Sequence, residues 1–228
     1  MTELIMIRHG QASFHGDDYD KLSPLGFKQS QVLARYLVKA AILPGAVYCG
    51  TMKRHRETLA AMEEIFAEMG NPIPQAVFMD ELKEYDHNAL MTCLVPEMTK
   101  EDPSLADTLA NVRNDPAAFQ RFFRQVVDRW LSGRFPAGAV ESWDEFTGRV
   151  MAGIDLIQKK SSGMKTVFAI SSGGPVSVVA GAALGLSPAR TIRLGWEIAN
   201  GSISRFKLGS KGPVLTVFNA FSYLEQEG

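Results

Sequence analysis

The chain has 228 residues, a mass of 25.0 kDa and a formal net charge of −1. Its hydrophobic content of 46% and charged content of 21% are ordinary for a globular protein, and its length is sufficient to bury a full core. The balanced charge argues against a general binder of nucleic acid or of anionic membranes, so an anion site must be a local concentration of charge.

The two cysteines, Cys49 and Cys93, form neither a disulfide framework nor a metal-ligand cluster, and we expect both thiols to be reduced. The N-terminus has no signal-peptide pattern. The most apolar later segment, residues 176–186, has about half the length needed to span a bilayer. These features predict a cytoplasmic protein.

The first third of the chain alternates short apolar runs with amphipathic segments. Residues 4–7 predict a buried strand, and Ser23 and Pro24 are typical of the N-cap and first residue of a helix. The apolar face of this helix is predicted to comprise Leu25, Val32, Leu33, Tyr36, Leu37 and Ala40. Strands at 46–49 and 76–79 flank a second helix that begins near Met52, and this order predicts a sheet covered by helices on both faces.

The middle of the chain, about residues 86–141, has helical rather than strand patterns. Its clearest helix carries an apolar stripe that we interpret as core packing, formed by Phe119, Phe122, Phe123, Val126, Val127 and Trp130. We predict one domain, residues 1–228, in which 86–141 is a helical insertion that forms a lid over the strand ends.

The last third returns to the α/β pattern. The sequence SWDE at 142–145 is a capping box that begins a helix, and a strand at 166–170 precedes a turn and a helix at 175–184. Two late strands are predicted at 202–208 and 214–218.

Three polar segments directly follow predicted strands. They are RHG at 8–10, MKRHRET at 52–58 and SSGGP at 171–175. An arginine fork suits phosphate oxygens, a histidine can act as nucleophile, acid or base, and the free N–H groups of a helix start favour anions. Each segment alone is compatible with a solvated turn, whereas the three together favour a phosphate pocket.

In these segments the chain resembles the histidine phosphatase superfamily, the phosphoglycerate mutase-like proteins. RHG at 8–10 matches the family signature, and LSPLGFKQS at 22–30 matches the helix that follows it. VYCGTMKRHRET at 47–58 resembles the segment of the second arginine, which falls on Arg54. ELKE at 81–84 resembles the acidic segment and puts the proton donor at Glu84. VFAISSGGP at 167–175 resembles the segment of the second histidine, where this chain has Ser172.

The resemblance implies a three-layer α/β/α sandwich with a mostly parallel sheet of about six strands. It also implies that His9 attacks a phosphoryl group and becomes a phosphohistidine, while Arg8 and Arg54 bind the phosphoryl oxygens. Glu84 would protonate the leaving oxygen, and Ser172 and Gly173 would contribute to phosphate binding. No metal and no cofactor are implied.

The serine at position 172 predicts reduced activity, since it keeps one hydrogen-bond donor and loses the imidazole. His15, His55 and His87 are candidates to compensate, and their alternative interpretations are a loop surface, a core-facing helix position and a loop polar group. The sequence EYDHNAL at 84–90 lacks the glycine-bearing pattern of mutases, which disfavours phosphoglycerate mutase activity.

The sequence therefore favours a metal-independent phosphatase that acts on a small phosphorylated molecule or a phosphoprotein. The alternative is a degenerate family member that binds a phosphorylated ligand or protein without turnover. An α/β-hydrolase that uses Ser172 is disfavoured, because Ile170 stands where the G-x-S-x-G turn needs its first glycine. The sequence indicates neither the substrate nor the oligomeric state.

Overall fold

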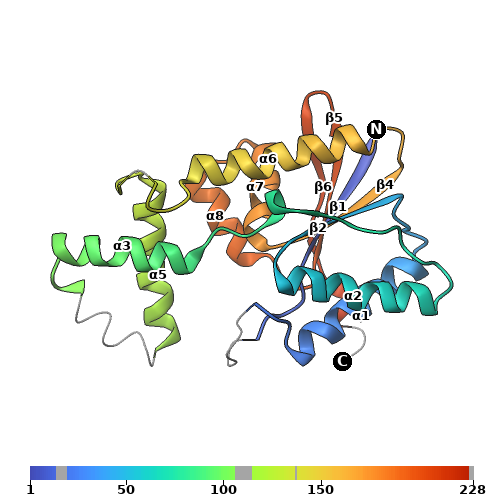
Figure 1. Ribbon diagram of the computed structural model, residues 1–228, viewed down its shortest axis with the longest axis horizontal. Coiled ribbons are helices and arrows are strands. Elements are labelled where there is room, and N and C mark those ends of the chain that lie inside the picture. Colours follow the sequence, from blue (N-terminus) through green and yellow to red (C-terminus); the bar gives the residue numbers. More distant parts are fainter. Residues whose placement is uncertain (14–19, 106–114, 137, 226–228) are drawn as a thin grey trace. The chain divides into compact units, whose positions relative to one another are not determined.

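The computed structural model describes residues 1–13, 20–105, 115–136 and 138–225 (Figure 1). The chain divides into two compact units. The larger comprises Met1–Glu84 and Arg149–Gly228, and the smaller comprises Tyr85–Gly148. The smaller unit contains the predicted insertion at 86–141, and its action as a lid stays a prediction.

The larger unit is built on a six-stranded sheet with the order β3-β2-β4-β1-β5-β6. The strands β1 to β4 pair in parallel, whereas β5 and β6 are antiparallel to their neighbours. The prediction of a mostly parallel sheet of about six strands is confirmed. The strands are β1 (Thr2–Arg8), β2 (Ala46–Gly50), β3 (Val77–Met79), β4 (Thr166–Ser171), β5 (Ile203–Gly209) and β6 (Gly212–Ala220).

Helices cover both faces of this sheet (Figure 1). Because side chains alternate along a strand, Ile5 and Ile7 of β1 pack in one core cluster with α1 (Pro24–Lys39) and α2 (Lys53–Glu68). Leu4 and Met6 are equally buried and face the other way. On that side lie α7 (Gly173–Leu184), α8 (Pro188–Glu197) and the second part of α6 (Trp143–Lys160). The predicted α/β/α layering is therefore observed.

The helix α1 begins as the sequence predicts. The Ser23 side chain accepts a hydrogen bond from the Gly26 N–H at 3.1 Å, and Pro24 is the first helical residue. The predicted apolar face was too wide, because Leu25 is 49% exposed and Tyr36 is 38% exposed. Tyr36 instead stacks on the ring of Tyr223, with 4.5 Å between the ring centroids.

The start of α7 differs from the prediction, which placed its first residue at Pro175. The helix begins at Gly173, so the two glycines belong to the helix and not to a turn. A Cβ atom on Gly173 would lie 2.8 Å from the Gly195 carbonyl oxygen, so the absence of a side chain permits α7 to pack closely on α8. The helix α8 itself was not predicted.

The smaller unit contains α3 (His87–Glu101), α5 (Pro116–Leu131) and the beginning of α6. Most of the predicted stripe of α5 is buried, although Phe119 at its beginning is 43% exposed. The capping box is observed, since Ser142 and Glu145 exchange side-chain to backbone hydrogen bonds. No helix in the described part of the chain is long and apolar enough to cross a membrane.

Gly10 and Gly26 bring the loop after β1 against the beginning of α1. A Cβ atom on Gly10 would lie 2.2 Å from the Gly26 carbonyl oxygen, and this backbone contact has no flexible side chain that can move away. We expect Gly10→Ala to lower the free energy of unfolding by about 1–3 kcal/mol or more. In contrast, Gly148→Ala in α6 meets no atom within 4 Å and is expected to stabilise by about 0.4–1 kcal/mol. Urea unfolding of both variants tests the contrast, and equal effects would contradict it.

Candidate active site

The three polar segments meet at the carboxyl ends of β1, β2 and β4. Arg8 and Ser171 are register partners in the parallel β1–β4 pair, and the His9 N–H donates to the Ser171 carbonyl at 2.9 Å. The next residues, His9 and Ser172, therefore leave the sheet side by side. On the other side of β4, β2 leads into the first turn of α2, which carries Arg54.

The hydrogen bonds of His9 determine which ring nitrogen carries its proton. Arg54 Nε, which can only donate, lies 3.0 Å from His9 Nε2, so Nε2 must accept. The proton then lies on Nδ1, which is 2.6 Å from the Gly10 carbonyl oxygen. His9 is 5% exposed. The ring is thus held as a neutral imidazole whose Nε2 lone pair is directed toward a cation.

Arg54 connects the three polar segments through a single guanidinium group. Besides His9, it contacts Asp20 at 2.7 Å through Nη1 and Ser172 Oγ at 3.5 Å through Nη2. Its side chain is 5% exposed, whereas that of Asp20 is 35% exposed. Arg54 is therefore a buried cation that presents N–H groups to both His9 and Ser172.

Ser172 is fully buried between β4 and α7, and its closest polar partner is His55 of α2. The distance from Ser172 Oγ to His55 Nε2 is 2.7 Å. The His55 ring centroid also lies 5.6 Å from that of His9. The structure thus places His55, one of three candidate compensating histidines, beside the predicted site. His87 is at the beginning of α3 in the smaller unit, and His15 lies outside the described residues.

Two predicted site residues, Glu84 and Arg8, lie beside the beginning of α7, where Gly173 is the first residue. Glu84 Oε2 accepts a hydrogen bond of 3.0 Å from the Gly174 N–H, which orients the carboxyl group toward the helix N-terminus. Arg8 donates through Nη1 to the Ile198 carbonyl, and its guanidinium carbon lies 3.7 Å from where a Cβ atom of Gly173 would stand. The predicted site residues all belong to the larger unit.

Two supporting residues were not singled out from the sequence. Thr58 Oγ1 accepts a hydrogen bond from the Gly10 N–H at 3.1 Å and donates one to the Arg54 carbonyl at 2.8 Å. Thr58 thus connects α2 to the loop after β1. Asn200 Nδ2 donates to the His9 carbonyl at 3.1 Å. The position of Thr58 inside MKRHRET was the only available signal, because the contacts of Asn200 depend on the tertiary fold.

Burial controls the protonation of both histidines. The pKa of His9 is well below its usual value because of burial, followed by the charges of His55, Arg54 and Arg8. The pKa of His55 is also lowered by burial and by Arg54, while the Gly50 backbone carbonyl, as a hydrogen-bond acceptor, acts in the opposite direction. Both rings are therefore neutral at pH 7, as a nitrogen nucleophile must be.

The family model described as histidine phosphatase superfamily (branch 1) matches residues 4–220, nearly the whole chain. The chain belongs to this superfamily. The assignment agrees with the resemblance carried by RHG at 8–10 and by the segments that follow it. A comparison with curated proteins finds no match.

Solved structures that resemble this superfamily member extend over the same length. YhfR of Bacillus stearothermophilus has a TM-score of 0.66 at 16% identity, covering 98% of this chain and 100% of that one. A mutant phosphoserine phosphatase of Entamoeba histolytica, in complex with phosphoserine, has a TM-score of 0.63 at 19% identity, with coverages of 98% and 100%. A putative alpha-ribazole-5'-P phosphatase of Escherichia coli has a TM-score of 0.62 at 20% identity and covers 96% of each chain. At these identities the likeness shows the fold alone.

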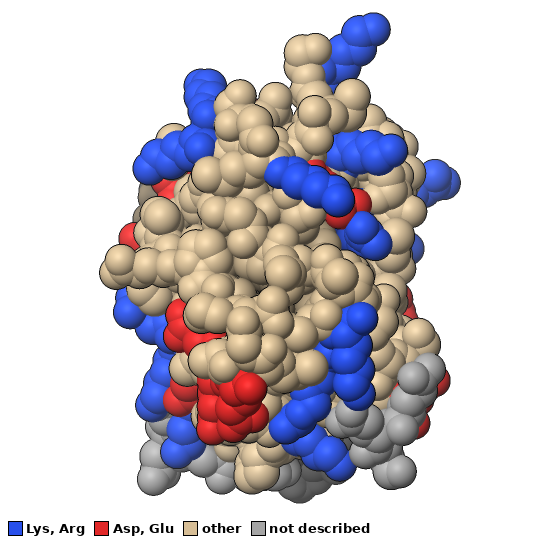
Figure 2. Space-filling view, turned by 90° about the vertical axis from the view of Figure 1, so that its right-hand side faces the viewer, with Lys and Arg blue, Asp and Glu red and all other residues tan. Residues whose placement is uncertain are grey.

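Charged residues of this histidine phosphatase superfamily member are arranged differently on its surface and in its candidate site. On the face shown in Figure 2, Lys and Arg side chains lie in separate groups, with one concentration of Asp and Glu. The described residues of that face form no continuous basic surface. In the site, by contrast, two arginines converge from β1 and α2, as expected for a local anion pocket in a chain of net charge −1.

The buried histidines predict that stability declines in mild acid. In the unfolded chain a histidine takes up a proton as the pH falls through about 6.5, whereas His9 and His55 in the folded protein resist protonation. The free energy of unfolding should therefore fall below about pH 6.5, by up to about 1.4 kcal/mol per pH unit for each histidine. Urea unfolding between pH 7 and 5 measures this slope, and His55→Gln should reduce it. An identical slope in the variant would contradict the prediction.

Proposed function

We propose that this protein is a metal-independent phosphatase that hydrolyses a phosphoester through a phosphohistidine on His9. The observation that supports this most strongly is the neutral His9 ring, whose Nε2 faces Arg54 Nε at 3.0 Å while Nδ1 faces the Gly10 carbonyl. Phosphoryl transfer mainly requires positioning and stabilisation of charge, and an oriented nitrogen beside a buried arginine meets both requirements.

The reaction would have two steps. In the first, the His9 Nε2 lone pair forms a bond to phosphorus as the bond to the ester oxygen breaks, and Glu84 gives that oxygen a proton. In the second, water attacks the phosphohistidine, its proton returns to Glu84, and phosphate and neutral His9 are released. The sum consumes one water and yields an alcohol and phosphate, so no metal or cofactor is required.

The arginines would exchange partners when the substrate binds. Arg54 donates to His9 Nε2 in the structure, so this N–H must turn to a phosphoryl oxygen to leave the lone pair available. Arg8 and the N–H groups at the beginning of α7, including that of Gly173, would bind further oxygens. Glu84 is held beside the same helix end by Gly174, which brings acid and anion-binding groups together.

The substrate class we propose is a small phosphomonoester or a phosphoprotein. The solved structures with this fold include proteins named as phosphatases of phosphoserine, of alpha-ribazole-5'-P and of glucosyl-3-phosphoglycerate. A cytoplasmic location, expected from the sequence, stays a prediction.

A phosphate-release screen tests this function. The purified protein, with EDTA present, is incubated with phosphoserine, sugar phosphates, 3-phosphoglycerate, a phosphopeptide and an aryl phosphate. We expect release from at least one substrate at a rate that EDTA leaves unchanged. Phosphate binding without release from any substrate would favour the alternative, a binding protein that carries Ser172 where the family has its second histidine.

Glu84→Gln tests the role of the acid. An amide cannot transfer a proton, so we expect kcat to fall by about 10²–10⁴-fold on an alkyl phosphate. The loss should be much smaller on an aryl phosphate with a good leaving group, because that oxygen departs without a proton. A folding defect in the variant would lower the rate on both substrates, so the difference between the two losses reports proton donation alone. Equal losses on both would contradict proton donation by Glu84.

A further inference from the structure

The Ser172 hydroxyl is directed toward α2 and not used by its own helix. Ser172 is the N-cap residue of α7, a position where serine normally caps, yet its side chain makes no cap hydrogen bond. Its Oγ instead lies 2.7 Å from His55 Nε2 and 3.5 Å from Arg54 Nη2. The hydroxyl therefore joins α7 to the two adjacent polar residues of α2.

The His55 ring occupies a position that its neighbours shape closely. It is fully buried, and a Cβ atom on Gly50 would lie 2.2 Å from its Nδ1, so a glycine at the end of β2 makes room for the ring. An apolar side chain would be sufficient for packing at this point of α2, and burying a polar ring beside the cationic Arg54 is unfavourable unless hydrogen bonds compensate. The placement of the ring against Ser172 and 5.6 Å from His9 points to a role in the site.

We propose that His55 is a positioning residue for phosphoryl transfer and acts through Ser172. In the phosphoryl-bound enzyme, His55 carries its proton on Nε2 and donates it in a hydrogen bond to Ser172 Oγ. The Ser172 hydroxyl then donates to an oxygen of the phosphoryl group on its way to His9. No proton is transferred along this series of hydrogen bonds. The inference rests on the function proposed above.

The geometry explains why the imidazole determines the direction of the hydroxyl. Ser172 Oγ has two lone pairs and one hydrogen. When His55 Nε2 and Arg54 Nη2 both donate to Oγ, both lone pairs are used, so the hydroxyl hydrogen must point to a third partner. Because Ser172 and His9 directly follow register partners of adjacent parallel strands, a phosphoryl group on its way to His9 would be that partner. Hydrogen bonds connected in series, as from His55 to Ser172 and on to the phosphoryl oxygen, also polarise and strengthen one another.

The same geometry predicts what happens when a second imidazole is added. In Ser172→His the new ring would meet His55, whose Nε2 already lies 2.7 Å from Oγ, so the single variant is overpacked. His55→Ala removes the obstructing ring. The exchange variant His55→Ala/Ser172→His should therefore have a higher kcat than either single variant, because the new imidazole can then reach the phosphoryl group directly.

The test is a double-mutant cycle on an aryl phosphate with wild type, His55→Leu, Ser172→Ala and the double variant. Leucine fills the space of the ring without a donor. Each single change should lower kcat about tenfold to a hundredfold with little change in KM, and the double variant should be no slower than the slower single variant. His55→Gln, which keeps a nitrogen donor, should retain more of the wild-type kcat than His55→Leu.

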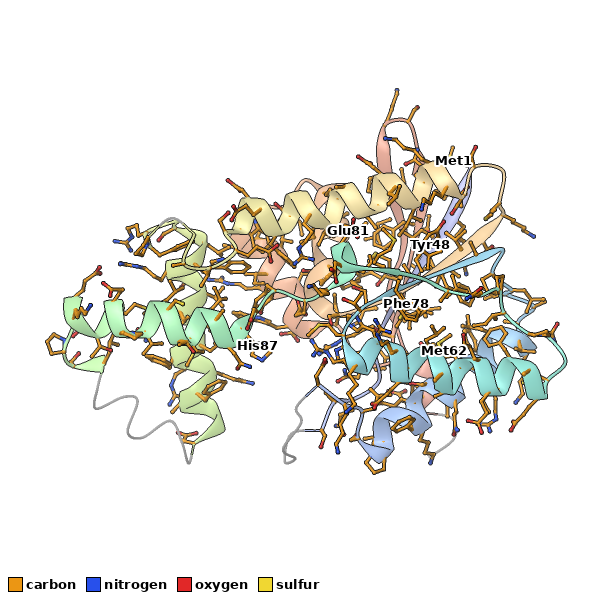
Figure 3. All side chains as sticks on the ribbon, in the orientation of Figure 1. Met1, Tyr48, Met62, Phe78, Glu81 and His87 are labelled. Atoms are coloured by element: carbon orange, nitrogen blue, oxygen red, sulfur yellow. The ribbon has the colours of Figure 1, made fainter. Side chains whose placement is uncertain are left out.

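Two matched controls separate this role from general stability. Met62→Ala removes a buried core side chain of the same helix (Figure 3), and Ser161→Ala removes a buried hydroxyl that contacts Tyr48. Both should keep the wild-type kcat if folded. Additive losses in the cycle, or an unchanged kcat in folded His55→Leu, would overturn the inference alone. A wild type that is inert on every phosphoester would overturn the proposed function and this inference with it.

Discussion

Replacement of His9 by glutamine should lower kcat by at least about 10³-fold and abolish the phosphoenzyme. Glutamine has no ring nitrogen to attack phosphorus, but its side-chain oxygen can still accept from Arg54 Nε, which lies 3.0 Å from Nε2 in the structure. We therefore expect a folded variant that still binds inorganic phosphate through Arg8 and Arg54. The measurement is kcat and KM on an aryl phosphate.

The control for His9→Gln is phosphate binding measured by calorimetry on the same sample, together with thermal unfolding. A variant that is folded, binds phosphate and retains kcat within tenfold of wild type would exclude His9 as the nucleophile. A loss of phosphate binding as well as turnover would show that the ring has a structural role.

Arg54→Lys should lower kcat/KM by about 10²–10³-fold, although the charge is kept. One guanidinium group contacts His9, Asp20 and Ser172 in three directions, and a lysine ammonium cannot span these partners. Phosphate affinity should fall as well, because Arg54 is a buried cation directed toward His9. Steady-state kinetics and phosphate titration measure both effects.

Arg56→Lys is the matched control, since it changes the same residue type two positions along the same helix. Arg56 is exposed, and its guanidinium carbon lies 4.3 Å from the centroid of the Phe78 ring, which is labelled in Figure 3. Its kcat/KM should stay within about twofold of wild type. Equal losses at the two positions would contradict a specific role for Arg54.

Much of the fold could be predicted because its signals are local. Strand β1 is a short apolar run, and Ser23 with Pro24 begins α1 as their capping chemistry requires. The failures came from tertiary packing. Gly173 and Gly174 were predicted to form a turn, whereas both belong to α7, where Gly173 packs closely against Gly195. The exposed Leu25 shows that helical periodicity does not determine how much of a face is covered.

The site was predictable in part for the same reason. The sequence predicts Arg8, His9 and Arg54 as candidate site residues from their positions at a strand end and at a helix start, and the structure brings His9 and Arg54 into contact. The contact between His55 and Ser172 was not predictable, because it joins residues 117 positions apart and depends on the glycine at position 50. From periodicity alone His55 is a core position of α2, and only the fold shows that its polar atom reaches Ser172.

The most direct test of this account is to trap the phosphoenzyme. The wild-type protein is mixed with a small phosphodonor, quenched under alkaline conditions that preserve phosphohistidine, digested and examined by mass spectrometry. We expect one phosphoryl adduct on His9, absent in His9→Gln and slower to appear in His55→Leu. A phosphoryl adduct on Ser172, or turnover with no adduct on His9, would contradict the central claim that His9 is the nucleophile.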